Sequence, residues 1–239
     1  IIVKRLRDRG IEIPTEQGAL DALIGEGYTD IYVQPLHFTG GEEFDKLKHN
    51  ILNHERAQEL NTLRVGRPLV YYMGQEEHPN DYQILIDTFV TSLSVSNEDG
   101  LLLVGHGGLG SCNSAYGYLQ YQLIRSGLNH VRVATLENAP YVDDVAVPWE
   151  WLDGKKPNKI YVHPLLLVLG DHALNDLFGD EEDSVVNVLK EAGYEVEEMH
   201  HALGEYTEIQ DIYCQHIQDC IDDIYGKRSS HRPAIPNVK

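Results

Sequence analysis

Two nearly identical segments lie far apart in this sequence. IYVQPL occupies residues 31–36, and IYVHPL occupies residues 160–165, which is 129 positions later. Self-similarity over such a distance indicates that one structural unit has been duplicated within the chain. We therefore expect two similar halves, an N-terminal half at 1–96 and a C-terminal half at 97–226, followed by an irregular tail at 227–239.

The duplication also predicts a segment before the first residue. The C-terminal half opens on LLLVGHGG at residue 101, and the counterpart of this segment in the first half would lie about 28 residues before Ile1. We therefore expect the natural protein to contain a further N-terminal strand and loop, which the first half lacks in this numbering.

Short apolar runs alternate with segments of helical periodicity, and this order is typical of βαβ units in a mostly parallel sheet. Continuous runs such as LLLV at 101–104 indicate strands that are covered on both faces. The sequence therefore predicts an α/β fold of two similar halves, each with a parallel sheet flanked by helices, and a cleft between the halves. The predicted strands are 31–37, 68–73, 101–105, 130–136, 160–168 and 194–199. The predicted helices are 2–9, 15–26, 42–58, 79–93, 112–126, 141–153, 181–192 and 206–225.

The composition limits the partners of the protein. The formal net charge of −19, from 38 acidic and 19 basic residues, disfavours binding to nucleic acid or to an anionic membrane. No apolar run approaches the roughly 20 residues that span a bilayer. The cysteines Cys112, Cys214 and Cys220 form no CxxC pair, which suits free thiols in a reducing compartment. We expect a cytoplasmic protein, although a segment before residue 1 could carry an export signal.

Three polar residues follow predicted strands of the C-terminal half. His106 follows LLLVG, Glu137 follows VRVATL, and His172 follows IYVHPLLLVLGD. Ligands of a doubly wound parallel sheet bind beyond the carboxyl ends of the strands, so we expect these side chains to converge there. Two imidazoles and one carboxylate suit a divalent transition metal and leave coordination positions open for a substrate.

Each of these residues also has a structural interpretation. His106 could fill the turn or cap the next helix, and Glu137 could be a capping carboxylate. His172 could lie beside a helix N-cap formed by Asp171 or Asn175.

The other histidines divide into further candidates and structural residues. His37 follows the repeated strand, and it could join the site or lie in the core. At most one of His200 and His201 is expected to face the cleft, because side chains alternate along a strand. His163 lies inside a predicted strand and is expected to be structural. Solvated helix positions are expected for His49 and His54.

The glycines around His106 allow two rival interpretations. Gly105, Gly107 and Gly110 match the G-x-G-x-x-G turn of a dinucleotide-binding fold, but the bulky His106 and a second histidine near the next strand have no role in that fold. An HGG segment can also be the oxyanion loop of an α/β-hydrolase, but the sequence contains no G-x-S-x-G nucleophile turn. A P-loop motif is absent as well.

The motifs around these candidates resemble the anaerobic cobaltochelatase family. The resembling segments are GHGG at 105–108, ATLENAP at 134–140, HPLLLVLGDHALNDLFGDEEDS at 163–184 and IYVQPLHFTGGEEFDKL at 31–47. Members of that family are ATP-independent class II chelatases that act on sirohydrochlorin in cobalamin synthesis. Their fold has two similar α/β halves with a cleft between them. The absent N-terminal strand and loop, which form part of the cleft floor in the family, are a departure from its pattern.

The resemblance implies roles for three residues of this chain. His106 and His172 match the family's metal-binding histidines, and Glu137 matches its acidic residue after the middle strand. Metal insertion replaces two pyrrole N–H protons, and neutral imidazoles, with a pKa of about 6.5, can hold a divalent metal and accept protons. The resemblance thus implies a lyase that inserts Co²⁺ into the tetrapyrrole sirohydrochlorin in cobalamin (porphyrin-type) biosynthesis. Ni²⁺, Fe²⁺ and Zn²⁺ also suit these ligands.

One property of the chain disagrees with such a substrate. A tetrapyrrole of this kind carries several carboxylates, and an acidic protein repels it unless the cleft supplies local N–H donors or positive charge. An alternative is therefore a non-catalytic metal- or tetrapyrrole-binding protein of the same fold.

The resemblance also implies a homo-oligomer.

Overall fold

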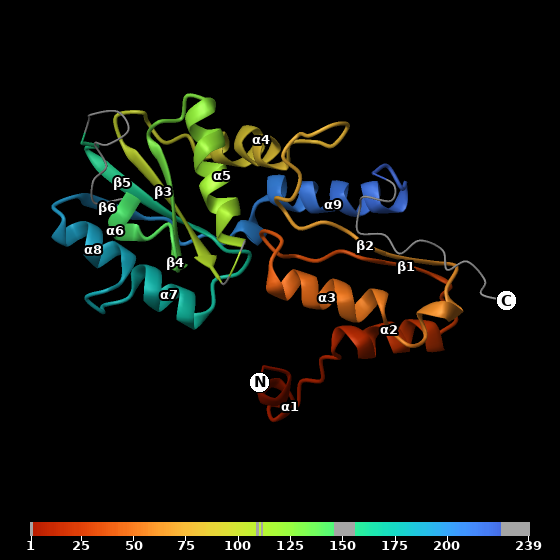
Figure 1. Ribbon diagram of the computed structural model, residues 1–239. Helices are drawn as coiled ribbons and strands as arrows, with labels where there is room; N and C mark the ends of the chain where they lie inside the picture. Colours follow the sequence, from red (N-terminus) through yellow and green to blue (C-terminus); the bar gives the residue numbers. More distant parts are fainter. Residues whose placement is uncertain (1, 109, 111, 146–155, 226–239) are drawn as a thin grey trace. The chain divides into compact units, whose positions relative to one another are not determined.

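The computed structural model describes residues 2–108, 110, 112–145 and 156–225 (Figure 1). Its contacts divide the chain into two compact units, each of which is described by itself. Unit 1 comprises the described residues of Ile1–Pro35, Glu43–Pro68 and Cys214–Lys239, and unit 2 comprises those of Leu36–Glu42 and Leu69–Tyr213. The bounds of the units differ from a division at residue 96, so the duplication and the cleft between the halves stay predictions.

Unit 2 is built on a four-stranded sheet with the order β4-β3-β5-β6. Its strands are β3 (Gly100–Gly107), β4 (Val131–Glu137), β5 (Lys159–Leu165) and β6 (Glu195–Glu198). Each neighbouring pair is parallel, so the carboxyl ends of these strands meet at one edge of the sheet. The prediction of a parallel sheet that includes the segments at 101–105, 130–136, 160–168 and 194–199 is confirmed.

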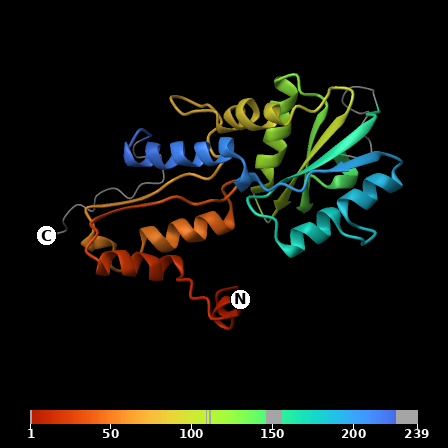
Figure 2. The same cartoon turned by 180° about the vertical axis from the view of Figure 1, so that it is seen from behind.

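The central strand of unit 2 is buried on both faces. Leu101 and Leu103 pack into one apolar cluster, and Leu102 and Val104 pack into another, and the side chains of all four are at most 1% exposed. The first cluster includes residues of α5 (Cys112–Arg125). The second includes residues of α7 (Asp171–Phe178) and α8 (Val185–Glu191), which lie on the other side of the sheet (Figures 1 and 2). The continuous run LLLV reflects this two-sided burial.

The other helical segments of unit 2 have the following bounds. They are α4 (Asp81–Leu85), a π-helical turn (Ile86–Val90), a 3₁₀ turn (Thr91–Leu93), α6 (Val142–Val145), α7 (Asp171–Phe178), α8 (Val185–Glu191), a second 3₁₀ turn (Leu203–Glu205) and α9 (Thr207–Ile221), which continues into unit 1. The predicted helix at 141–153 begins with α6, and its residues from 146 on lie outside the described residues. Helix α7 was not among the predicted helices.

Unit 1 contains a sheet of two parallel strands, β1 (Asp30–Val33) and β2 (Thr62–Val65).

The prediction of a strand at 68–73 is wrong, because this segment forms only isolated bridges. The amides of Tyr71 and Tyr72 donate to the carboxylate of the buried Asp81 and not to a neighbouring strand. The helical segments of unit 1 are α1 (Ile2–Arg7), α2 (Glu16–Gly25), α3 (Glu42–Leu52, whose first residue belongs to unit 2) and a 3₁₀ turn (Ala57–Glu59).

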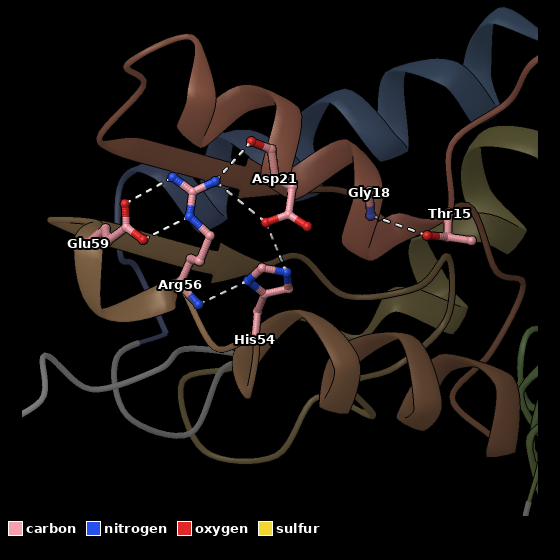
Figure 3. Close-up of polar contacts among 6 residues, drawn as sticks. All are labelled: Thr15, Gly18, Asp21, His54, Arg56 and Glu59. Carbon is pink, nitrogen blue, oxygen red and sulfur yellow. Dashed lines mark hydrogen bonds and ion pairs between the residues drawn. The ribbon is translucent and has the colours of Figure 1, made fainter.

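A polar network joins α2 to the segment before β2 (Figure 3). The backbone amide of Arg56 donates to Nδ1 of His54 at 3.2 Å, so the ring proton is on Nε2, which lies 3.5 Å from the carboxylate of Asp21. The guanidinium of Arg56 pairs with Glu59 at 2.8 Å. His54 is only 8% exposed, so the prediction that it is solvated is wrong, whereas His49 is exposed as predicted.

Among the described residues, no helix is both long enough and apolar enough to cross a membrane.

Candidate functional site

The carboxyl ends of β3 and β4 meet at a close backbone contact. The register pairs Gly107 with Glu137, and Gly107 has a φ of +77°. A Cβ atom at Gly107 would lie 1.9 Å from the carbonyl oxygen of Glu137, so only glycine fits there. The glycine-rich turn therefore lets two strand ends approach each other.

His106 is exposed at this sheet edge. Its Nδ1 lies 3.1 Å from the carbonyl oxygen of Gly107, and a carbonyl only accepts, so Nδ1 carries the ring proton. The lone pair of the imidazole is therefore on Nε2. A backbone carbonyl that fixes the tautomer in this way is common behind metal-binding histidines, and it leaves Nε2 available as a ligand.

Glu137 is also exposed, and the loop after it is tied to its surroundings. Asn113 of α5 donates to the carbonyl groups of Glu137 and Ala139, at 3.2 Å and 2.7 Å. Asn138 donates to the carbonyl of Gly108 at 3.0 Å, which joins the loop after β4 to the loop after β3. These asparagines position the candidate site, and sequence reasoning missed them, although Asn138 lies within the motif ATLENAP.

The register gives the side chains of His106 and Glu137 different directions. Glu137 pairs with Gly107 and not with His106, so in a regular pleat the two side chains would leave opposite faces of the sheet. The positive φ of Gly107 interrupts the pleat one residue after His106. A metal shared by the two side chains would therefore lie beyond the end of the sheet.

His172 lies in the first turn of α7, which follows β5 at the same sheet edge. Its side chain is outside the described residues. Gly170 is the N-cap of α7, so the structural interpretation with Asp171 or Asn175 as the N-cap is wrong. Among the side chains that the structure describes, no three from His, Cys, Asp and Glu are placed to hold a metal ion together. The three-ligand site thus stays a prediction.

A pocket of about 900 Å³ lies within unit 2, beyond the carboxyl ends of β5 and β6. Its walls come from the loop after β5, from α7, from the segment after β6 and from α9. The lining residues are Leu36, Leu167, Val168, Leu169, Leu174, His200, Ala202, Gly204, Glu205, Ile209, Gln210 and Tyr213. Val168 is 74% exposed and Leu36 is 55% exposed, so the pocket presents apolar surface to the solvent, as ligand-binding sites do.

The two adjacent histidines after β6 behave differently. His200 lines the pocket, whereas His201 does not and instead lies with Nδ1 3.2 Å from the carboxylate of Glu205. The prediction that at most one of these two histidines faces a cavity agrees with this arrangement.

The ring of His163 makes hydrogen bonds at both nitrogens, whereas the hydrogen bond described for His37 is made by its backbone carbonyl. His163 is fully buried, with Nδ1 donating to the carbonyl of Pro164 and Nε2 accepting from the hydroxyl of Tyr206. Burial lowers the pKa of His163 to about 4, so this histidine is neutral and structural, as predicted. His37 is half-buried, and its carbonyl accepts from the hydroxyl of Tyr213 at 2.9 Å. Its role in the site stays open between the two interpretations.

The parallel sheet flanked by helices makes this an α/β protein, and exposed polar residues lie at the carboxyl edge of its four-stranded sheet. The family model described as cobalt chelatase (CbiK) matches residues 1–222, so the chain belongs to the cobalt chelatase family. A sirohydrochlorin cobaltochelatase of Salmonella typhimurium is 29% identical over 225 residues, which are 93% of this chain and 80% of that protein. The sirohydrochlorin cobaltochelatase CbiKC of Nitratidesulfovibrio vulgaris is 26% identical over 201 residues, which are 83% of this chain and 68% of that protein.

Two solved structures share the fold. SirB from Bacillus subtilis with Fe³⁺ matches with a TM-score of 0.64 and 17% identity, over 92% of this chain and 82% of that chain. CbiX, the terminal enzyme for siroheme biosynthesis in denitrifying bacteria, matches with a TM-score of 0.50 and 16% identity, over 81% of this chain and 76% of that chain. The predicted α/β fold with parallel sheets flanked by helices and the predicted family are therefore confirmed.

Proposed function

We propose that this protein inserts Co²⁺ into sirohydrochlorin in anaerobic cobalamin biosynthesis. The observation that carries the proposal is the family match over residues 1–222, together with two relatives that bear this activity in their names. The geometry supports it, since a histidine with a free Nε2 and a carboxylate lie at the carboxyl edge of the sheet of unit 2.

Three residues are proposed to act on the metal. His106 and His172 bind the incoming ion through imidazole nitrogens and afterwards accept protons, and Glu137 completes the ligand set. Histidine and carboxylate ligands release a borderline metal more readily than a thiolate site does, which suits delivery to a macrocycle. Co²⁺ is the substrate metal of the proposed reaction, and the same ligands suit Ni²⁺, Fe²⁺ and Zn²⁺.

The apolar pocket is proposed to hold the macrocycle. Its leucine and valine side chains suit the flat apolar face of a tetrapyrrole, and the exposed Leu36 and Val168 extend this surface outward. The carboxylates of the substrate would then point to solvent, which lowers their repulsion from an acidic protein. We further propose that the protein acts in the cytoplasm and that it forms a homo-oligomer.

The test is a metal-insertion assay with matched variants. The purified protein is mixed with sirohydrochlorin and Co²⁺, and the absorbance change on insertion is followed. We expect insertion well above the spontaneous rate, and a loss of about 100-fold or more in His106→Ala and His172→Ala, because each removes a metal ligand and proton acceptor. His49→Ala, which changes an exposed histidine on α3, serves as the control and should match the parent.

Insertion by the parent at the spontaneous rate would contradict the proposed reaction. The alternative function, tetrapyrrole or metal binding without turnover, would then remain. It is favoured in that case by the apolar pocket, and it predicts tight binding of sirohydrochlorin in a fluorescence titration without any insertion.

A further inference from the structure

His200 is held in a defined orientation at the wall of the pocket. Its Nε2 lies 3.0 Å from Oε2 of Glu198, and its ring packs against Phe178 of α7, with 4.3 Å between the ring centroids. The side chain of His200 is still 53% exposed, so a molecule in the pocket can reach it. Two different neighbours therefore fix one imidazole that faces a ligand cavity.

The contact with Glu198 determines which nitrogen can accept a proton. A carboxylate accepts hydrogen bonds, so the proton of the neutral ring lies on Nε2 and the lone pair lies on Nδ1. His200 lines the pocket and Glu198 does not. A carboxylate behind an imidazole also stabilises the imidazolium that forms when Nδ1 takes a proton.

In the proposed reaction the metal ligands can accept protons only after they have released the ion, so a proton acceptor that is not a ligand can act while the ion is still bound. Two N–H bonds of the macrocycle break when the metal enters, and each nitrogen keeps its electron pair for the metal. His106 donates through Nδ1 to a carbonyl, so its only lone pair is the one that would bind the metal. While His106 holds the ion, it cannot accept a proton.

We infer that His200 accepts one of the two protons that metal insertion releases, with Glu198 as its positioning residue. This inference rests on the proposed function and adds a residue to its chemistry. The proton passes from a pyrrole nitrogen to Nδ1 of His200, which becomes an imidazolium and later loses the proton to water. Glu198 also lies 3.5 Å from Lys190, and Glu205 is a further charged residue of the pocket wall.

The adjacent His201 provides a matched control. It is also exposed and also paired with a carboxylate, but it lies outside the pocket lining. His200 and His201 are thus adjacent in the sequence, both exposed and both paired with a carboxylate, and they differ in that His200 lines the cavity and His201 does not.

The experiment measures Co²⁺ insertion into sirohydrochlorin between pH 5.5 and 9 for the parent, His200→Ala, Glu198→Gln and His201→Ala. We expect His200→Ala to lower the maximal rate about 10-fold, less than the full effect of a buried base because water can replace an exposed one. Added imidazole should restore part of this rate. Glu198→Gln should also lower the maximal rate, because a neutral amide stabilises the charged ring less than a carboxylate does. His201→Ala should match the parent.

Several outcomes would overturn the inference. In one, His200→Ala keeps both the rate and the pH profile of an active parent. In another, His200→Ala weakens the binding of sirohydrochlorin in a fluorescence titration and leaves the maximal rate unchanged, which would make His200 a binding group. A parent that inserts no metal above the spontaneous rate would overturn the proposed function itself, and this inference with it.

Discussion

The two units use their polar side chains in different ways. In unit 1 the buried Arg67 and Asp219 form an ion pair at 2.7 Å, and the network of Figure 3 joins α2 to the segment before β2. In unit 2 a four-stranded sheet is held by apolar clusters on both faces, and His106 and Glu137 stand exposed where its strands end. A stable apolar sheet can present polar groups to a substrate, because those groups are not needed to hold the fold.

The largest expected effect concerns the buried ion pair of unit 1. Arg67 and Asp219 are 6% and 5% exposed, so Arg67→Met leaves a buried carboxylate without its cation. We expect a loss of about 3–5 kcal/mol in the free energy of unfolding, measured by urea denaturation. The double variant Arg67→Met with Asp219→Leu should recover much of this loss. If Arg67→Met is as stable as the parent, the ion pair does not contribute to the stability of unit 1 as this account states.

The second effect concerns pH and the buried histidine of unit 2. His163 has a pKa of about 4 in the folded protein, against about 6.5 in an unfolded chain. The unfolded chain therefore binds a proton first as the pH falls, and stability should decrease from about pH 6.5 down to about pH 4, by about 3 kcal/mol in total. The measurement is urea denaturation at several pH values. His163→Gln, which cannot titrate, should reduce this slope, and an unchanged slope would contradict the assignment.

The smallest effect compares one helix cap from each unit. The hydroxyl of Thr15 accepts from the amide of Gly18 at the start of α2 (Figure 3), and the buried Ser184 accepts from Asn187 at the start of α8. Thr15→Ala and Ser184→Ala should each lower the free energy of unfolding by about 1 kcal/mol, seen by thermal denaturation. Neither should change the insertion rate of the folded protein. A change in the insertion rate for Thr15→Ala would contradict a purely structural role for this cap.

The same difference between the units explains what the sequence could predict of the fold. The central strand of unit 2 contains a continuous apolar run, and each strand of this unit was predicted to within a few residues. In unit 1 the strand Thr62–Val65 contains Arg64, whose guanidinium donates to the carbonyl of Cys220, and so the strand lacks an apolar pattern. The more apolar segment at 68–73 took its place in the prediction. Helix α7 was missed because it has only eight residues and its N-cap, Gly170, provides no side-chain cap that the sequence could show.

For the candidate site, the sequence could predict only which strand ends share one edge of the sheet. The parallel order of the strands brings the ends of β3 and β4 to one edge, and this placed His106 and Glu137 near each other. The bond between Asn138 and Gly108 and the contact between His163 and Tyr206 join residues 30 and 43 positions apart. Such contacts depend on the path of the loops, which no local pattern encodes. The pairing of His200 with Glu198 likewise required coordinates.

The most direct test of the central claim is a crystal structure of the protein soaked with Co²⁺. The account predicts one ion beyond the ends of β3, β4 and β5, within about 2.0–2.2 Å of an imidazole nitrogen of both His106 and His172 and of a carboxylate oxygen of Glu137. An ion bound elsewhere, with these three side chains directed to separate regions, would contradict the account.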